Sequence, residues 1–342
     1  KARVVIVGNS EAPINQECID GYGAMGALAT EEGLRQLEGK QPSDPSEVDW
    51  RRASRPFGQN CGFTLAESAQ FVVLMDDALA LQLGAEVHGA VTDVFINADG
   101  FKKSISAPGP GNYLTMAKAV ASAIQIVGED SVRQHSFVHA HGSSTPANRV
   151  TESELLDRIA ATFGIHAWPV TAAKAYVGHS LASASADQLV SALGSFKYQI
   201  IPGIKTIDAI ADDVHQQHLR ISTTDTRRDE QPLEVCFINS KGFGGNNASA
   251  VVLAPQVVDR MLEKRYGAQR FADYCALREH TRAAASRYDQ QAQTGQFNIL
   301  YNFGNDQIDD QQLQMTAQQI QVPGFRQPLV FSKDPRFSDM LD

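Results

Sequence analysis

The stretch that decides the fold is FVHAHGSSTP at residues 137–146. An apolar run here ends in a histidine, a glycine and small hydroxyl residues, which is the pattern of a buried strand entering a turn. Two later blocks repeat it, KAYVGH at residues 174–179 and FINSKGFGGNN at residues 237–247. If these segments share one sheet, their turns bring two histidines, a lysine and a glycine-rich loop to one rim.

The rest of the chain alternates between strand and helix patterns. Continuous apolar runs at residues 4–7 and 71–75 are typical of strands buried on both faces. Alternation of strands with helices of about 10 to 15 residues indicates an α/β fold. The predicted strands are 87–98, 136–141, 168–173 and an antiparallel pair at 235–240 and 249–253, and the predicted helices are 19–37, 76–83, 113–127, 150–163 and 181–196.

Composition limits the class of protein. The chain has 342 residues, a hydrophobic fraction of 43%, a charged fraction of 20% and a net charge of −9. The acidic balance argues against nucleic-acid binding, and no apolar run reaches the roughly 20 residues of a membrane span. The cysteines, at positions 18, 61, 236 and 275, are widely spaced. This spacing argues against a zinc site or a disulfide framework and favours a reducing cytoplasm.

Taken together, the three blocks resemble the C-terminal catalytic motifs of the β-ketoacyl-acyl-carrier-protein synthases, which are thiolase-like condensing enzymes. The family pattern is H-G-T-x-T-P, then K-x-x-x-G-H, then N-S-F-G-F-G-G-x-N. Three earlier segments follow in the family's order, namely VVIVGNSE at 4–11, GYGAMGALAT at 21–30 and ASRPF at 53–57. The resemblance implies an α/β fold with the thiolase-like layering, an α-β-α-β-α sandwich.

The resemblance also predicts how the chain is organised. Residues 1–254 are expected to form the thiolase-like region, with the end of the N-terminal half and the whole C-terminal half of a synthase. The family's nucleophilic cysteine lies upstream of the strand that begins here near Lys1, so we expect the nucleophile outside this chain. Residues 255–342 have no counterpart in the family pattern. They are interpreted as a mainly helical accessory tail, with docking of a partner or carrier protein and disorder as the alternatives.

Four residues are assigned catalytic roles by this resemblance. His141 and His179 are expected to stabilise the enolate formed when a malonyl thioester loses CO2, because preorganised N–H donors stabilise a developing oxyanion. Lys174 is expected to order the site through a salt bridge with Glu152, and such a pair also tunes a neighbouring imidazole. An ordinary surface pair is the alternative. His139 has no family counterpart and is interpreted as structural.

Four further residues are assigned to substrate binding. Ser143 and Thr145 match the family's hydroxyl positions that hydrogen-bond the pantetheine arm, with simple turn chemistry as the alternative. Phe243 lies between Gly242 and Gly244, and flanking glycines let a loop change its backbone conformation. The resemblance implies that this aromatic loop gates the acyl tunnel, and core packing is the alternative.

The chain departs from the family at several positions. Lys241 stands where the family has phenylalanine, and Gln188 ends a stretch that is usually richer in glycine. Cys61 replaces part of a usual Arg-Asp pair and, like Cys18, shows no strand-to-helix elbow of the kind a nucleophile occupies. These changes around intact histidines indicate a divergent member with an unusual acyl substrate.

The sequence therefore predicts the C-terminal part of a cytoplasmic synthase that performs decarboxylative Claisen condensation in fatty-acid or polyketide synthesis. The partners implied are acyl carrier protein, acyl and malonyl thioesters, the N-terminal half of the synthase and a second protomer. No metal or other cofactor is expected, because the phosphopantetheine arm arrives on the substrate. The alternative is a non-catalytic subunit, similar to a chain-length factor, that shapes the tunnel of a catalytic mate.

Overall fold

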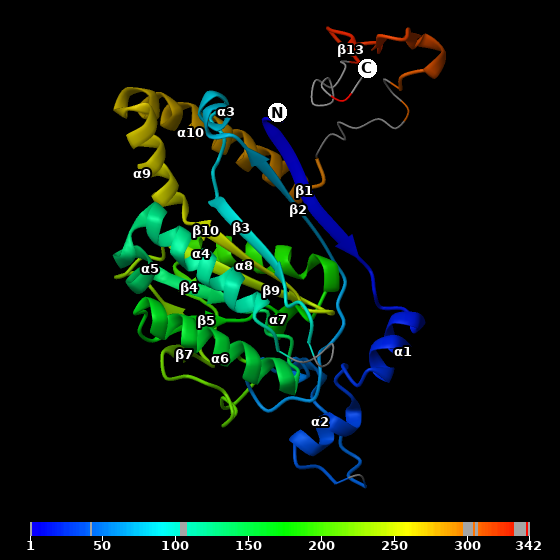
Figure 1. The fold of residues 1–342 in the computed structure, drawn as a ribbon, viewed down its shortest axis with the longest axis vertical. Helices are drawn as coiled ribbons and strands as arrows, with labels where there is room; N and C mark the ends of the chain where they lie inside the picture. The colour runs from blue at the N-terminus through cyan, green and yellow to red at the C-terminus, as the bar shows by residue number, and fades with distance from the viewer. Residues whose placement is uncertain are drawn as a thin grey trace. The chain divides into compact units, whose positions relative to one another are not determined.

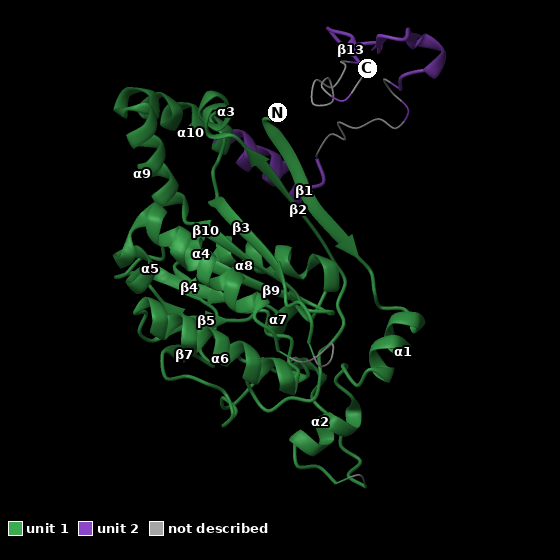
Figure 2. Cartoon of the chain, viewed as in Figure 1, with its two compact units in different colours: residues 1–282 green, residues 283–342 purple. Residues whose placement is uncertain are grey.

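The computed structural model describes residues 2–41, 43–102, 108–296, 304, 307–331 and 340. Its contacts divide the chain into two compact units, residues 1–282 and residues 283–342 (Figure 2). Parts of the predicted tail, including residues 297–303 and 332–339, lie outside the described residues. None of the helices described is both long and apolar enough to span a membrane.

The first unit is built on a mixed six-stranded sheet with the order β3-β10-β9-β4-β5-β7 (Figure 1). On one side of the sheet β9, β4, β5 and β7 run parallel to one another. On the other side β10 runs antiparallel to both β9 and β3. The strands are β3 Ala90–Ala98, β4 Ser136–His139, β5 Trp168–Thr171, β7 Leu219–Ile221, β9 Val235–Gly242 and β10 Asn246–Leu253, and β6 Ile200–Ile201 with β8 Thr226–Arg227 forms a small separate ribbon.

Helices cover both faces of this sheet. The side chain of Asn239 on β9 hydrogen-bonds to α4 (Gly111–Val127) and α6 (Pro146–Phe163), whereas that of its neighbour Ser240 hydrogen-bonds to α8 (Ala184–Tyr198). Successive residues of a strand point to opposite faces, so α4 and α6 lie on one face and α8 on the other. This sandwich of a mixed sheet between helical layers agrees with the predicted α/β class.

The core fills the space between these layers. The largest fully buried side chains on and around the strands include Trp168, Phe137 and Phe237. The Trp168 and Phe237 rings meet edge to face at 5.5 Å, and Phe137 meets Phe196 of α8 at 5.7 Å. Burial of such aromatic surface is the main source of stability in a domain of this size. It fixes the strand ends that carry the three sequence blocks.

The two apolar runs near the N-terminus form strands, but their burial differs from the prediction. β1 (Val4–Glu11) pairs antiparallel with β2 (Ser68–Met75) in a separate two-stranded ribbon. Ile6 is 71% exposed and Phe71 is 64% exposed, so neither strand is covered on both faces. The prediction of doubly covered strands is wrong for the described structure, because a ribbon of two strands has too little neighbouring chain to cover it.

Helix boundaries also differ in detail from those predicted. The segment 19–37 is two helices, α1 Gln16–Ala24 and α2 Glu31–Leu37. Gly26 adopts φ +63° between them, and the Thr30 hydroxyl accepts the Gly33 N–H as an N-cap. These are ordinary stop and start signals that divide the helix. The other short helices are α3 Asp77–Leu83, α5 Glu129–His135 and α7 Lys174–Val177, with 3-10 turns at Trp50–Arg52 and Leu181–Ser183.

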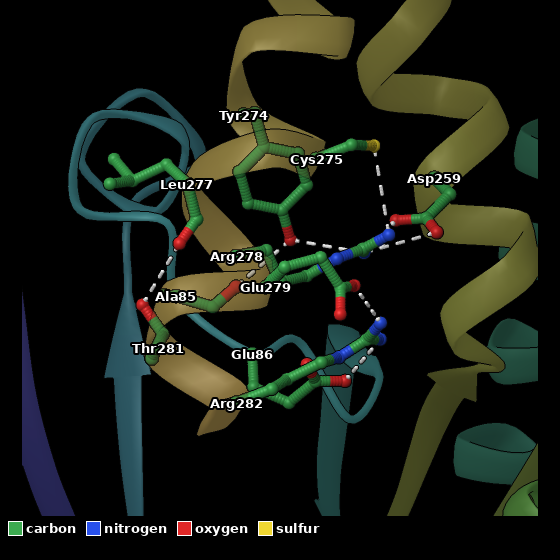
Figure 3. A network of polar contacts seen from close by, with 10 residues as sticks. All are labelled: Ala85, Glu86, Asp259, Tyr274, Cys275, Leu277, Arg278, Glu279, Thr281 and Arg282. Atoms are coloured by element: carbon green, nitrogen blue, oxygen red, sulfur yellow. Dashed lines mark hydrogen bonds and ion pairs between the residues drawn. The ribbon is translucent and has the colours of Figure 1, made fainter. Parts of the chain in front are cut away.

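Beyond residue 254 the chain is helical, as predicted for the start of the tail. α9 (Pro255–Tyr266) and α10 (Ala268–Gln293) follow, and by their contacts the residues up to Arg282 belong to the first unit. The Arg278 guanidinium pairs with Asp259 of α9 at 3.0 Å, and Tyr274 Oη donates to the Ala85 carbonyl (Figure 3). Arg282 pairs with Glu86 in the same network.

The second unit begins within the last turns of α10. Its described part includes a small antiparallel sheet of β11 (Gln314–Met315), β12 (Gln319–Gln321) and β13 (Leu329–Val330). A 3-10 turn at Asp310–Gln312 precedes this sheet. The predicted division at residue 254, and the accessory role of residues 255–342, stay predictions.

Candidate active site

The parallel strands bring two of the sequence blocks to one rim. β4 ends at His139, and the Ala140 N–H continues the pairing by donating to Thr171, the last residue of β5. His141 therefore leaves β4 directly beside the point where the chain leaves β5 towards Lys174. Carboxyl ends of neighbouring parallel strands form the usual ligand-binding edge of such sheets.

His141 and His179 meet at this rim. Their ring centroids lie 5.3 Å apart with the ring planes 80° to one another, and each residue is only 8% exposed. The Phe63 ring lies 5.1 Å from that of His179. The chain around Phe63 is held there, since the His179 N–H donates to the Thr64 carbonyl and the Ala66 N–H donates to the His179 carbonyl. The structure thus brings the two predicted histidines together.

Hydrogen bonds fix the tautomer of both rings. Nδ1 of His141 accepts the Lys241 N–H at 3.3 Å, and Nδ1 of His179 accepts the Leu181 N–H at 3.1 Å. A neutral imidazole that accepts at Nδ1 carries its hydrogen on Nε2. Both rings can therefore offer an Nε2–H donor.

Both rings are also held neutral. Burial, assisted by the nearby Lys174 charge, lowers the pKa of His179 to about 2. Burial also lowers the pKa of His141 well below its usual value, with the charges of Lys174 and Lys241 adding to the effect. Desolvation disfavours an imidazolium, and a neighbouring cation disfavours it further. Two neutral imidazoles therefore lie next to each other at the site.

Lys174 supplies the charge beside them. Its Nζ donates to the His141 carbonyl at 2.6 Å and lies 3.4 Å from His141 Nδ1. The side chain is buried, which lowers the pKa of Lys174 to about 8, while Glu152 and Asp187 act in the opposite direction. The ammonium thus stays protonated at neutral pH.

Glu152 takes a different part from the one predicted. Among the described residues it forms no ion pair with Lys174, so the predicted salt bridge is wrong. Its carboxylate instead accepts the N–H groups of His141 at 2.7 Å and Gly142 at 2.9 Å. It also accepts side-chain amides at 2.9 and 2.6 Å, from Asn148 and Asn239. Buried N–H groups of a turn need acceptors, and Glu152 provides them while acting on Lys174 at longer range.

Sequence reasoning missed Gln188, which lies on the face of the sheet opposite Glu152 and also holds the strand ends together. The Gln188 amide nitrogen donates to the carbonyls of His139, Ala140 and Asn239, and its oxygen accepts the Ser240 hydroxyl at 3.0 Å. Gln188 is fully buried. One amide thereby joins the ends of β4 and β9, which carry His141 and Lys241. In the sequence it stood out only as a departure from a glycine-rich stretch.

The predicted substrate-binding residues lie on the loops of the rim. Ser143 Oγ and Thr145 Oγ1 are 3.1 Å apart and share a hydrogen bond, so these side chains lie together as the alternation predicts. Phe243 is 53% exposed and its ring lies 5.8 Å from that of Tyr22. Gly244 adopts φ +84°, which a residue with a Cβ rarely adopts. Their roles towards pantetheine and acyl chain stay proposals.

His139 and two of the cysteines have surroundings that suit structural roles. His139 is fully buried, neither ring nitrogen has a partner among the described residues, and burial lowers its pKa to about 3. Burial raises the pKa of the Cys61 thiol and, more strongly, that of Cys236. Thiols with a raised pKa are poor nucleophiles at neutral pH.

Comparisons with known proteins identify relatives that agree with one another. Residues 88–208 match the family model described as the C-terminal domain of β-ketoacyl synthases. The chain is 73% identical over its whole length to β-ketoacyl-[acyl-carrier-protein] synthase FabY of Pseudomonas aeruginosa, and covers 53% of that protein. It is 27% identical over 253 residues to 3-oxoacyl-[acyl-carrier-protein] synthase 2 of Vibrio cholerae, with 73% of this chain and 55% of that protein covered. The chain thus spans about half the length of the curated relatives it matches.

Solved structures agree with these relatives. The crystal structure of the ketosynthase FabY from P. aeruginosa superposes with a TM-score of 0.90, covering all of this chain and 52% of that one. A type II polyketide ketosynthase, solved with its acyl-carrier protein, matches at 21% identity with a TM-score of 0.60, which bears on the fold alone; the match covers 74% of this chain and 56% of that one. The predicted thiolase-like fold is confirmed, and the chain belongs to the β-ketoacyl-acyl-carrier-protein synthase family.

Proposed function

We propose that this chain is the catalytic C-terminal part of a β-ketoacyl-acyl-carrier-protein synthase, which joins an acyl thioester to malonyl-acyl-carrier protein in fatty-acid synthesis. The observation that carries the proposal is the pair of neutral imidazoles, 5.3 Å apart, whose Nδ1 atoms both accept backbone N–H groups. Their Nε2–H donors suit an enolate oxygen, and preorganised donors of this kind supply a large part of catalytic stabilisation.

The reaction proceeds in two steps after the enzyme has been acylated. The C–C bond to the malonyl carboxylate breaks, CO2 leaves, and the electron pair becomes the enolate of the thioester. The enolate carbon then attacks the acyl carbonyl, and the cysteine thiolate departs with the electrons of its C–S bond. The product is a β-ketoacyl thioester two carbons longer than the primer. His141 and His179 hold the enolate oxygen, and Lys174 keeps His141 in place.

The thiolate is proposed to come from a cysteine upstream of Lys1. The raised pKa of the Cys61 and Cys236 thiols supports an external nucleophile, because neither favours a thiolate at neutral pH. The curated relatives extend well beyond the part that this chain covers. The remaining partners proposed are a second protomer and the N-terminal half of the synthase, acting in the cytoplasm.

Substrate contacts are proposed on the same basis. Both relatives are named as synthases of acyl-carrier-protein thioesters, so acyl carrier protein is proposed as the carrier here. Ser143 and Thr145 then hold the pantetheine arm through their paired hydroxyls, and Phe243 with Gly244 gates the acyl chain. The exposure of Phe243 and the positive φ of Gly244 support a loop that changes conformation.

The experiment uses the full-length protein with an acyl primer and malonyl-acyl-carrier protein. CO2 release and a β-ketoacyl product, followed by mass spectrometry, are expected in stoichiometric amounts. A non-catalytic tunnel-shaping subunit would release no CO2 and would form product only when a catalytic mate is added. That outcome would replace the proposed enzyme by the alternative.

A further inference from the structure

The chain leaves His179 through a strained turn at residues 179–181, called here the His179 turn. Leu181 has φ +51°, in the left-handed region that residues with a Cβ rarely adopt. In this conformation the Leu181 N–H donates to His179 Nδ1 at 3.1 Å. The turn therefore sets both the tautomer and the orientation of the His179 ring. Backbone strain of this kind persists only where neighbouring groups hold it.

A carboxylate on α8 holds the middle residue of this turn. Ser180 is fully buried, and its hydroxyl donates to Asp187 Oδ2. Asp187 lies in the first turn of α8, where the helix dipole favours a negative charge. A hydrogen bond to a carboxylate is stronger than one between two neutral groups. Ser180, which lies between the ring and the strained residue, is thus fixed by its side chain.

The same carboxylate is tied to the ribbon of β1 and β2. The Gln70 side-chain amide donates to Asp187 Oδ1 at 2.9 Å, and the Ser68 hydroxyl donates to Oδ2 at 3.4 Å. Both of these residues lie on β2. Ser183, at the end of the following 3-10 turn, donates to the Ser68 carbonyl at 3.3 Å. Since Asp187 is held from β2 as well as from α8, it offers Ser180 an acceptor in a fixed place.

Asp187 could act through its charge or through its hydrogen bonds. The side-chain donors to its carboxylate among the described residues are neutral groups, namely hydroxyls and an amide. Its charge acts on Lys174 only through space, where it raises the pKa of the ammonium. Asparagine keeps an acceptor for Ser180 and removes the charge. The two modes of action can therefore be separated by one substitution.

Resting on the proposed function, we propose that Asp187 is a positioning residue, which holds Ser180 and with it the turn that orients His179 for decarboxylation. The His179 donor matters most where charge develops on the enolate oxygen. Displacing this donor should therefore lower kcat and leave the KM for malonyl-acyl-carrier protein close to that of the wild type. A displacement of about 1 Å can cost on the order of 100-fold in rate.

The test measures kcat and KM for malonyl decarboxylation in the full-length protein. Asp187→Ala and Ser180→Ala should each lower kcat by roughly 10- to 100-fold, and Asp187→Asn should keep most of it. Asp229→Ala removes an exposed, ion-paired aspartate and should keep the wild-type rate. Equal losses of kcat in Asp187→Ala and Asp187→Asn would assign the effect to the charge and overturn the inference. A change in KM alone would also overturn it.

A second background shows whether Asp187 acts through His179. In His179→Ala the donor is already absent, so adding Asp187→Ala should lower kcat little further, because residues that act through one group are not additive. A loss as large as in the wild-type background would place the action of Asp187 elsewhere and overturn the inference.

Hydrogen exchange gives a readout that is separate from turnover. The Leu181 amide is protected by its bond to His179 Nδ1, so residues 179–183 should exchange faster in Asp187→Ala and in Ser180→Ala than in wild type or Asp187→Asn. If the wild type releases no CO2 but shows this pattern, the positioning role stands and the proposed reaction falls. If the wild type condenses and both alanine variants keep its kcat, the reaction stands and the role of Asp187 falls.

Discussion

The Lys174 Nζ contacts two atoms of His141: it donates to the His141 carbonyl at 2.6 Å and lies 3.4 Å from the ring Nδ1. The Glu152 carboxylate accepts the backbone N–H of the same residue. Main chain and ring of His141 are thus fixed by two buried, oppositely charged side chains that do not pair with each other. Each side chain therefore positions His141 through a different atom, although no salt bridge links the two.

Lys174 should give the decarboxylation step a pH dependence. Its pKa of about 8 means that the ammonium is present below that value and is lost as pH rises through it. We expect kcat for malonyl decarboxylation to fall above about pH 8 in wild type. Lys174→Met should be slower by on the order of 10- to 100-fold, as for a lost charged hydrogen bond. Its rate should also be flat across that range. A limb near pH 8 that persists in Lys174→Met would assign it to another group.

His139 should contribute to acid sensitivity. Its folded pKa of about 3 lies below the unfolded value, so the unfolded state binds a proton first and stability falls as pH drops below about 6.5. Between pH 7 and pH 5 one such residue costs about 2 kcal/mol of unfolding free energy. Unfolding free energies measured with urea at pH 7 and pH 5 should differ by that much less in His139→Leu than in wild type. His88→Leu, at an exposed position, should not, and equal effects of the two would reject the assignment.

The sequence was informative about the site because its signals are local. Histidine, lysine and glycine at the ends of apolar runs indicate which groups meet, since carboxyl ends of parallel strands share an edge. The partner of Glu152 could not be read in this way. A carboxylate beside a turn can pair with a lysine or accept backbone N–H groups, and only the path of the Gly142 turn, with φ +51°, decides between them.

Burial was less predictable than strand formation. The runs at 4–7 and 71–75 have the composition of covered strands and do form strands, yet Ile6 and Phe71 remain largely exposed. Coverage depends on which other segments pack against a strand, and that information is not contained in the strand itself. The same limit applies to Gln188, whose three carbonyl acceptors lie on β9 and at or just after the end of β4.

Gly84 should be required for α10 to pack. It ends α3 at φ +61°, and a Cβ there would lie 2.5 Å from Leu277 Cγ and 2.8 Å from the Leu277 carbonyl carbon. Gly164 ends α6 at φ +68°, but its Cβ would meet only the Arg133 side chain at 3.4 Å or more. Left-handed strain of about 1–2 kcal/mol applies to alanine at both. Gly84→Ala should therefore lower the unfolding free energy more than Gly164→Ala does, and it should raise the rate of hydrogen exchange in α10. Equal losses of stability in the two variants would contradict the predicted clash with Leu277.

The arginines of the α10 network should contribute unequally (Figure 3). The Arg278 side chain is 12% exposed, pairs with Asp259 and lies 4.8 Å from the centre of the Tyr274 ring. Arg278→Met should lower the unfolding free energy by about 1–3 kcal/mol. Arg282, 45% exposed in its pair with Glu86, should cost below about 1 kcal/mol when changed to Met. Chemical denaturation would measure both, and the reverse order would refute this ranking.

The most direct measurement of the central claim is the rate of malonyl decarboxylation in full-length His141→Ala and His179→Ala, taken beside the extent of cysteine acylation. Each histidine is assigned to the enolate oxygen rather than to the thiol, so the two steps should separate. Loss of one oxyanion donor typically costs on the order of 10²–10³ in rate. We predict a decarboxylation loss of that size or greater with acylation still detectable. Condensation at the wild-type rate, or loss of acylation with decarboxylation intact, would contradict the account.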